Sequence, residues 1–224
     1  TFVAVDCNGF AGLGIAADVE FCRNIVKPLN PINKEILPEP ARVDGHFSTY
    51  APNFTEIMVS FSMDPFVITG VEDVKWWING VTMDMSETVS PTGAPPEGYN
   101  TPFANAFQFK PLWKGFYIED IEVTLPEKFS ANEEPITIGV HDLVIDDMGV
   151  SCSVSAEDVL GLEKGNAGGW GFSIQSFELV VLMNNISKAE FSGKVHVPIL
   201  RSISNTSGSM QEADCLDYLA NIQP

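Results

Sequence analysis

The stretch FYIEDIEV, residues 116–123, decides the fold expected for this chain. Its apolar residues alternate with polar ones as in a β-strand, but the alternation slips between Ile118 and Ile121, which are separated by two residues instead of one. A β-bulge, which inserts one extra residue into a strand, returns the apolar side chains to the same face after such a slip. We therefore predict a bulged strand here, with its apolar side chains buried and its acids facing water.

A second segment, FSIQSFEL at residues 172–179, repeats the pattern at an offset of 56. Both segments follow a Trp and a Gly, and His141 and His196 recur downstream at an offset of 55. Residues 76–83, WWINGVTM, show the same slip, although Asn79-Gly80 is also a strong hairpin signal and leaves a turn as the alternative. Self-similarity at a fixed period is typical of repeat proteins. The stretch 103–200 is therefore expected to hold two repeat units.

Elsewhere, short runs rich in Phe, Val, Ile and Thr are broken by Gly, Pro, Asn and Asp, which predicts strands joined by turns. We expect an all-β fold of repeated bulged strands, arranged as a sandwich or a broad β-solenoid. The last segment, EADCLDYLANI at residues 212–222, has Cys215, Leu216, Leu219 and Ile222 at helical spacing. It predicts a short C-terminal helix.

Two proline-rich stretches, 28–40 and 91–102, predict extended connectors. They divide the chain into N-terminal strands with a connector (1–42), a β segment ending in a proline-rich loop (43–102), the repeat region (103–200), and a polar linker with the helix (201–224). The chain opens with Thr1 and a strand-like FVAVD, from which we expect a piece of a larger polypeptide or a processed product.

Thirty acidic residues against twelve basic ones give a formal net charge of -18. This charge repels phosphate backbones and anionic lipids, so nucleic acid is not an expected partner. No apolar run approaches the ~20 residues of a membrane-spanning helix, and we expect no membrane insertion. A protein, or the remainder of a larger polypeptide, is the expected partner, with carbohydrate left open.

The four cysteines, Cys7, Cys22, Cys152 and Cys215, form no Cys-x-x-Cys motif. Free thiols are the favoured interpretation, although Cys7 and Cys22 could pair, and the redox compartment stays open.

Asp142, Asp146 and Asp147 form an acidic turn with Gly149, and oxygen ligands of this kind suit calcium. Their spacing matches no EF-hand loop, and turn aspartates more often cap their own backbone. We keep the three aspartates as calcium candidates but predict no structural metal and no cofactor.

Candidate catalytic residues are carboxylates and histidines. Glu119, Asp120 and Glu122, with Glu178 in the second copy, could supply a carboxylate pair for glycoside hydrolysis, but repeated charges are typical of a solvated face. A triad or zinc site would need His46, His141 or His196, and no Gly-x-Ser-x-Gly or His-Glu-x-x-His motif accompanies them. We predict structural histidines and assign no catalytic residue.

Tryptophans are the remaining candidates, because aromatic faces stack on sugars. Trp76, Trp77, Trp113 and Trp170 could line a sugar-stacking surface, although tryptophans at strand starts more often anchor a core. Trp76 and Trp77 are kept as candidate ligand-binding residues.

Three runs, LVIDDMGVS (143–151), GGWGFSI (168–174) and FSGKVHVPI (191–199), resemble a repeat of very large β-rich bacterial proteins, some of them near contractile injection systems. The resemblance spans about 109–199 and contains no catalytic motif. It implies a module of a secreted or delivered protein and no chemistry. We therefore expect a non-enzymatic structural or interaction module of a larger bacterial secreted or injection-system-associated protein, located outside the cell or delivered from it. The alternative is a carbohydrate-binding domain or a glycoside-acting enzyme.

Overall fold

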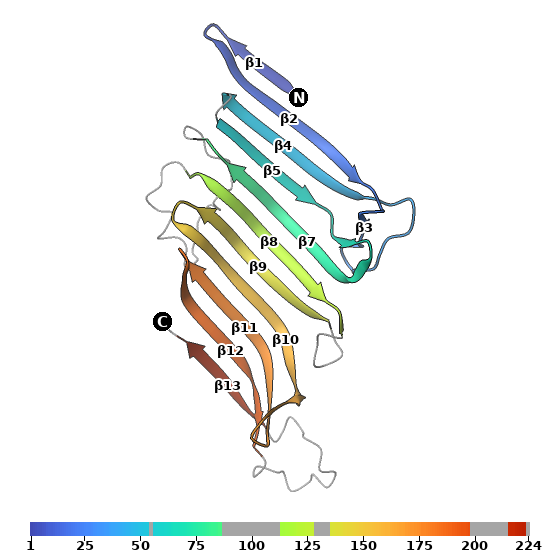
Figure 1. Cartoon of the computed structure of the whole chain (residues 1–224), viewed down its shortest axis with the longest axis vertical. Coiled ribbons are helices and arrows are strands. Elements are labelled where there is room, and N and C mark those ends of the chain that lie inside the picture. Colours follow the sequence, from blue (N-terminus) through green and yellow to red (C-terminus); the bar gives the residue numbers. More distant parts are fainter. Residues whose placement is uncertain (54–55, 87–112, 128–134, 198–214, 223–224) are drawn as a thin grey trace.

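The computed structural model describes residues 1–53, 56–86, 113–127, 135–197 and 215–222, and these residues form one antiparallel sheet (Figure 1). The strands are β1 Phe2–Asp6, β2 Gly9–Phe21, β3 Val26–Pro28, β4 Val43–Asn53, β5 Glu56–Met63, β6 Phe66–Ile68, β7 Val71–Asp84, β8 Gly115–Leu125, β9 Ile136–Asp146, β10 Gly149–Ala167, β11 Trp170–Leu182, β12 Asn185–His196 and β13 Cys215–Ile222.

Strand order in the sheet follows the chain closely. The main path is β1-β2-β4-β5-β7-β8-β9-β10-β11-β12-β13, and β3 pairs with β6, which pairs with β7. The expected segment boundaries therefore do not interrupt the sheet, because β2 pairs with β4 and β7 pairs with β8. Strands β1 and β13 form the two edges of the described sheet, far apart in Figure 1.

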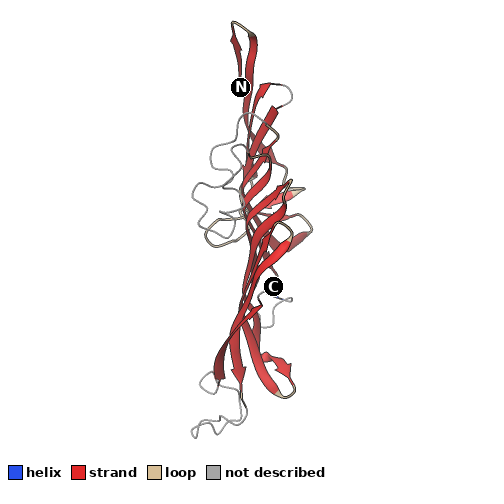
Figure 2. Cartoon of the chain, turned by 90° about the vertical axis from the view of Figure 1, so that its left-hand side faces the viewer, coloured by secondary structure: helices blue, strands red, loops and turns tan. Residues whose placement is uncertain are grey.

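The sheet is a single layer. Viewed edge-on it is a thin, twisted band (Figure 2), and strands contact almost exclusively the strands beside them. The expected sandwich or broad solenoid is therefore not the arrangement of the described residues, which form one open sheet. Alternation predicts that a strand has two unlike faces, but it does not say whether a second layer covers the apolar one.

The two faces of this sheet differ in chemistry. Paired residues on neighbouring strands share a face, so the register can be followed as rows across the sheet. One row is Ile78, Ile121, Val140, Val154, Leu179, Ala189, Ile222, and the next is Trp76, Val123, Ile138, Ala156, Phe177, Phe191, Ala220. We call the side carrying these two rows the apolar face.

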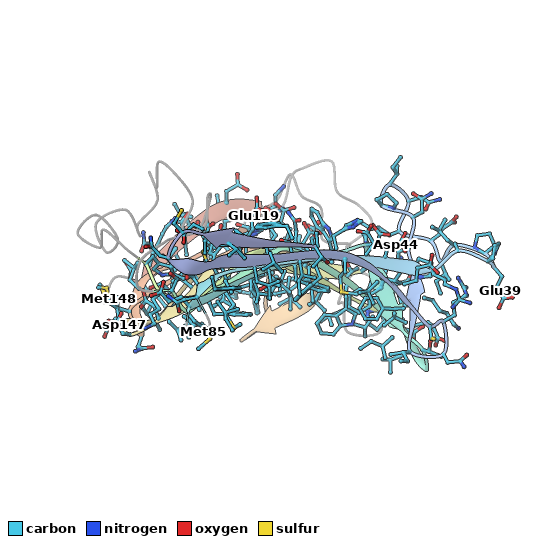
Figure 3. All side chains as sticks on the ribbon, turned by 90° about the horizontal axis from the view of Figure 1, so that it is seen from above. Glu39, Asp44, Met85, Glu119, Asp147 and Met148 are labelled. Atoms are coloured by element: carbon cyan, nitrogen blue, oxygen red, sulfur yellow. The ribbon has the colours of Figure 1, made fainter. Side chains whose placement is uncertain are left out.

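The opposite side, which we call the polar face, carries a row that alternates with the apolar ones. Its members are Trp77, Glu122, Gly139, Ser155, Glu178, Glu190 and Asn221. Figure 3 looks along the sheet and shows side chains projecting from both sides of a single layer of ribbon.

The best-buried core lies where β3 and β6 pack at one end of the sheet. Val43 is fully buried there against Val26 and Phe66, and Trp76 and Ile78 of the apolar face pack against the same cluster. A second small cluster joins Trp113, Tyr117 and Val144.

The slip predicted from the sequence has a structural counterpart in β8. Glu119 takes no partner in the register with β7 or β9, although pairing continues unshifted on both sides of it. The residues at its level are Gly80 and Asp142, which have positive φ angles of 63° and 51°. Three neighbouring strands thus each insert one residue at the same level, which preserves their register. Gly80 lies inside β7, so the hairpin alternative at Asn79-Gly80 is wrong.

The segments 116–123 and 172–179 both lie in strands, β8 and β11. Glu119 and Gln175 at their slips are exposed, as expected for surface positions. Burial of the apolar side chains is less than predicted, because Ile118 alone of the eight is buried and the others are half-buried. Among the described residues, these apolar side chains have neighbours beside them in the sheet but no second layer above them, which explains the shortfall.

The predicted C-terminal helix is wrong. Residues Cys215–Ile222 form strand β13, which pairs with β12 along its whole length. Leu216, Tyr218, Ala220 and Ile222 also alternate with period two, and pairing with β12 selects that period over the helical one.

Candidate functional site

The polar face brings together an acid, a histidine and a serine from three neighbouring strands. Asp120 of β8 lies opposite His141 of β9, and their Oδ1 and Nδ1 atoms are 2.6 Å apart. The other ring nitrogen, Nε2, lies 3.2 Å from Oγ of Ser155 in β10. With its proton on Nδ1, the ring donates to Asp120 and accepts from the serine hydroxyl. The three groups therefore share the connectivity of a serine hydrolase triad.

Gly139 makes this contact possible. It pairs with Ser155 across the β9–β10 ladder, and a Cβ on it would lie 2.6 Å from His141 Nε2 and 3.2 Å from Ser155 Oγ. A side chain at position 139 would therefore occupy the space in which the ring and the hydroxyl meet. No sequence motif marks Ser155 or Gly139, and only the strand register places them beside His141.

The surroundings of Ser155 do not favour acyl transfer. Its backbone lies in the ladders with β9 and β11, so the nearby N–H groups point along the sheet and not toward a substrate above it. Its partner on β11 is Glu178, whose carboxylate would repel a developing oxyanion. The arrangement can hold three strands together through charge-assisted hydrogen bonds.

The other two histidines occupy different settings. His46 Nδ1 lies 2.8 Å from Asp18 Oδ1 on the exposed polar face, and this hydrogen bond raises the pKa of His46. His196 is buried at the end of β12, opposite Gly171 and Cys215. His141 lies opposite Asp120 inside its strand, so the two histidines at an offset of 55 do not hold equivalent positions.

The candidate carboxylates Glu122 and Glu178 are too far apart for a glycosidase pair. Glu122 and Glu178 lie in one row but three strands apart, about 14 Å at the usual strand spacing, and glycosidase pairs lie about 5 to 9.5 Å apart. Each has a cationic neighbour: Lys34 lies 3.9 Å from Glu122, and Lys188 lies 2.8 Å from Glu178. Asp120 is held by His141, and Glu119 at the slip accepts a hydrogen bond from the Asn79 side-chain amide at 3.4 Å.

The aspartates proposed for calcium serve local structure. Asp142 accepts a hydrogen bond from the Tyr117 hydroxyl at 2.9 Å, and Asp146 accepts one from the Met148 N–H at 2.8 Å. Asp147 lies at the end of the sheet in Figure 3, near Met85. Within the described ranges, no three His, Cys, Asp or Glu side chains are grouped so that they could hold a metal ion. The absence of a structural metal stays a prediction.

Trp76 and Trp77 do not form one stacking surface. As neighbours on β7 they point to opposite faces: Trp76 packs into the cluster with Val26, Val43 and Phe66, whereas Lys34 Nζ lies 5.3 Å from the centre of the Trp77 ring. Trp113 is buried.

An apolar hollow of about 430 Å³ lies at the start of β11, and it is lined by Gly168, Trp170, Phe172, Val195 and Tyr218. The Trp170 side chain is half-exposed there, and the Tyr218 hydroxyl donates to the Ser173 carbonyl at 2.8 Å. The polar atom of Tyr218 is thus engaged, and the hollow offers mainly apolar surface. The sequence does not reveal this hollow, because the spacing in 212–222 predicts a helix that includes Tyr218.

A buried acid, Asp84, is the last residue of β7. Asp84 is only 1% exposed, and its Oδ1 accepts a hydrogen bond from the Ser86 N–H at 2.8 Å. Burial raises the pKa of Asp84, and the charge of Glu56 adds to this, while the Ser86 bond and Lys114 act in the opposite direction. No motif in the sequence marks this residue.

The remaining expectations concern the thiols and the membrane. None of the four described cysteines forms a disulfide bond, so Cys7 and Cys22 do not pair. Among the residues that the structure describes, no helix has the length and apolar character needed to cross a bilayer. Compared with known proteins, the chain matches no family model, no curated protein and no solved structure.

Proposed function

We propose that this chain is a non-enzymatic structural or interaction module of a larger bacterial protein that is secreted or associated with an injection system. One observation carries the proposal: the described strands form one sheet, and from β8 to β13 its apolar face has no second layer among the described residues. Contiguous apolar surface on a folded protein is typical of interaction sites, because its exposure to water is unfavourable.

The polar face supports the same conclusion. Three of its candidate catalytic groups form bonds between neighbouring strands: Asp120 with His141, and Glu178 with Lys188 at 2.8 Å. These contacts hold neighbouring strands in register, which is what a scaffold requires.

The context of the proposal comes from the sequence. The runs at 143–151, 168–174 and 191–199 resemble repeats of very large β-rich bacterial proteins, and from this we propose a secreted or delivered location and a protein partner. The high negative charge disfavours nucleic acid as that partner.

Carbohydrate binding is the second candidate, and the hollow at Trp170 is the observation that favours it. Its half-exposed indole ring offers a stacking surface for a sugar. Sugar sites also need polar groups that converge on hydroxyls, and the Tyr218 hydroxyl is already engaged with Ser173.

A glycan array with the wild-type chain, Trp170→Ala and Trp77→Ala tests the choice. The proposed module gives no reproducible glycan signal in any of the three proteins. Reproducible binding that is lost in Trp170→Ala and kept in Trp77→Ala would replace the module by a carbohydrate-binding domain. The matched control is Trp77, because its ring lies on the opposite face of another strand, beneath Lys34.

A further inference from the structure

The apolar face from β7 to β13 carries no charge in its two long rows. All fourteen residues of these rows are aliphatic or aromatic. Beside them runs a third row with the same character, made of Phe47, Phe61, Val81, Ile118 and Leu143. A face of this kind can pack against another apolar face, and it offers no ionic group by which a charged ligand could bind.

The structure shows what a cover does to this face. Where β3 and β6 pack near β4 and β7, Val43 is 0% and Phe66 is 8% exposed. At the other end of the same face, Leu216 is 55% and Ile222 is 58% exposed, and the residues between, from β8 to β12, are mostly half-buried. The cover that β3 and β6 supply is therefore missing from β8 to β13 among the described residues.

We propose that a second copy of this chain covers the apolar face, with strands β8 to β12 of the two copies packed face to face. The contact is isologous, so the same patch serves both copies and closes as a dimer. Two apolar sheet faces pack about 10 Å apart with their strands about 30° from parallel, which suits flat rows of Ile, Val, Leu and Phe. The inference rests on the proposed function, because it names the partner of that interaction module.

The distribution of charge permits this contact despite the net charge of -18. Asp120, Glu122, Glu178 and Glu190 all belong to rows of the polar face. Face-to-face packing leaves these acids on the two outer surfaces, separated by two sheets and by more than the ~8 Å over which salt screens charges. An edge-to-edge contact would instead bring the acidic faces of two copies side by side.

The surface area also fits. The chain exposes 13416 Å², whereas a compact monomer of its 24.4 kDa mass exposes about 10,000 Å². Two chains together carry an excess of about 6,000 Å², somewhat more than the ~2,000 to 5,000 Å² that obligate dimers bury in total. The excess surface of two chains is therefore large enough to supply the interface of a stable homodimer.

Sedimentation equilibrium between about 0.1 and 100 µM tests the proposal. The wild-type chain should reach a mass near twice 24.4 kDa. Ile138→Glu places a charge in the apolar row of β9 and should sediment as a monomer. Thr137→Glu is the matched control, because the exposed neighbour on the same strand points to the polar face and should remain dimeric. Far-ultraviolet circular dichroism checks that both variants are folded.

A milder substitution keeps the test decisive if Ile138→Glu does not fold. Ile138→Ala should remain folded and raise the dimer dissociation constant by about tenfold or more, as loss of an interface anchor does. A wild-type chain that is folded and monomeric at 100 µM overturns the proposal. A monomer that binds neutral phosphatidylcholine vesicles also overturns it, because the apolar face would then bind lipid. A dimer that is broken by Leu219→Asp on edge strand β13 but not by Ile138→Glu overturns it too, because the contact would then be at the edge. None of these results bears on the glycan array, so the two proposals can fail separately.

Discussion

At the scale of single residues, Asp120, His141 and Ser155 show that the hydrogen bonds of a triad do not by themselves make a catalytic site. Their hydrogen bonds match those of a triad, yet the hydroxyl lies on the flat face of a sheet with Glu178 as its neighbour on β11. A catalytic serine needs donors aimed at a developing oxyanion, and strand N–H groups in ladders point elsewhere. The network is therefore better explained as cross-strand bonding.

The first prediction concerns His141. His141→Ala should lower the free energy of unfolding by about 1 to 2 kcal/mol, because it removes two hydrogen bonds, one of them charge-assisted. The side chain is 39% exposed, which keeps the loss below that of a buried pair. Urea unfolding gives the value, and His46→Ala, whose ring is exposed, should lose much less. Hydrolysis of a nitrophenyl ester by the wild type that vanishes in Ser155→Ala would contradict the structural interpretation.

The second prediction concerns Asp84. A carboxyl whose pKa is higher in the folded state favours folding most below its unfolded pKa, and this contribution is lost as the pH rises through the folded pKa. Asp84→Asn removes the ionisation and keeps an oxygen for the Ser86 N–H. The variant should therefore be more stable than wild type at pH 7, and the gain should disappear near pH 3. Urea unfolding of both proteins at pH 7 and at pH 3 measures this difference in stability. A variant that gains less stability over wild type at pH 7 than at pH 3 would refute the prediction.

At the scale of elements, the slip in β7, β8 and β9 is the distinctive feature. Gly80, Glu119 and Asp142 stand at one level, and a positive φ at two of them lets three strands shift phase together. The sequence shows the slip in the spacing of Ile118 and Ile121. The coordination across strands becomes visible only when the register is known.

The third prediction concerns Gly80. Gly80→Ala should destabilise the fold by about 1 to 3 kcal/mol, because a Cβ is strained at a φ of 63° and would lie 2.5 Å from Glu119 Oε2. Thermal or urea unfolding measures the loss. Adding Glu119→Ala should recover part of it by removing the end of the side chain in contact. If the double variant recovers no stability, the loss in Gly80→Ala comes from backbone strain alone.

The fourth prediction concerns the half-burial of β8. Ile121→Ala should cost about 1 to 2 kcal/mol, less than the ~2 to 5 kcal/mol of a fully buried position, because Ile121 is only half-buried. Glu119→Ala, on exposed surface, should cost under about 0.5 kcal/mol. These values apply at concentrations below the dimer dissociation constant. A cost above about 4 kcal/mol for Ile121 in the monomer would show that the face is already covered within the chain.

At the scale of the whole molecule, one layer of strands separates an apolar face from an acidic one. The edges β1 and β13 carry exposed apolar side chains, among them Val5 and Leu219 at 72% and 67% exposure. The β13 edge has Asp217 as its one charged residue, and charge is a common protection of edge strands. The acidic outer surface, and not the edges, is expected to keep the dimer from associating further.

The fifth prediction follows from that charge. If copies pack through their apolar faces, raising sodium chloride from about 50 to 500 mM should tighten the dimer, because salt screens the repulsion between two chains of charge -18. The dissociation constant from sedimentation is the measurement, and uncharged sucrose at matched density is the control. Weakening by salt would indicate ion pairs across the contact instead of apolar packing.

The sequence by itself determined that the chain is β-rich and acidic, that 116–123 and 172–179 are strands, and that their phase slips near Glu119 and Gln175. These properties are local: alternation, spacing and charge depend on a residue and its near neighbours along the chain. The tertiary structure alone decided that the sheet is open and one layer thick, that Cys215–Ile222 is a strand, and that Ser155 meets His141 above Gly139. Each of these depends on which strands pair and in which register. Pairing joins residues that are distant in sequence. The spacing in 215–222 fits both the helical period and the strand period, so it could not choose between helix and strand. Alternation in a strand likewise could not reveal what covers a face.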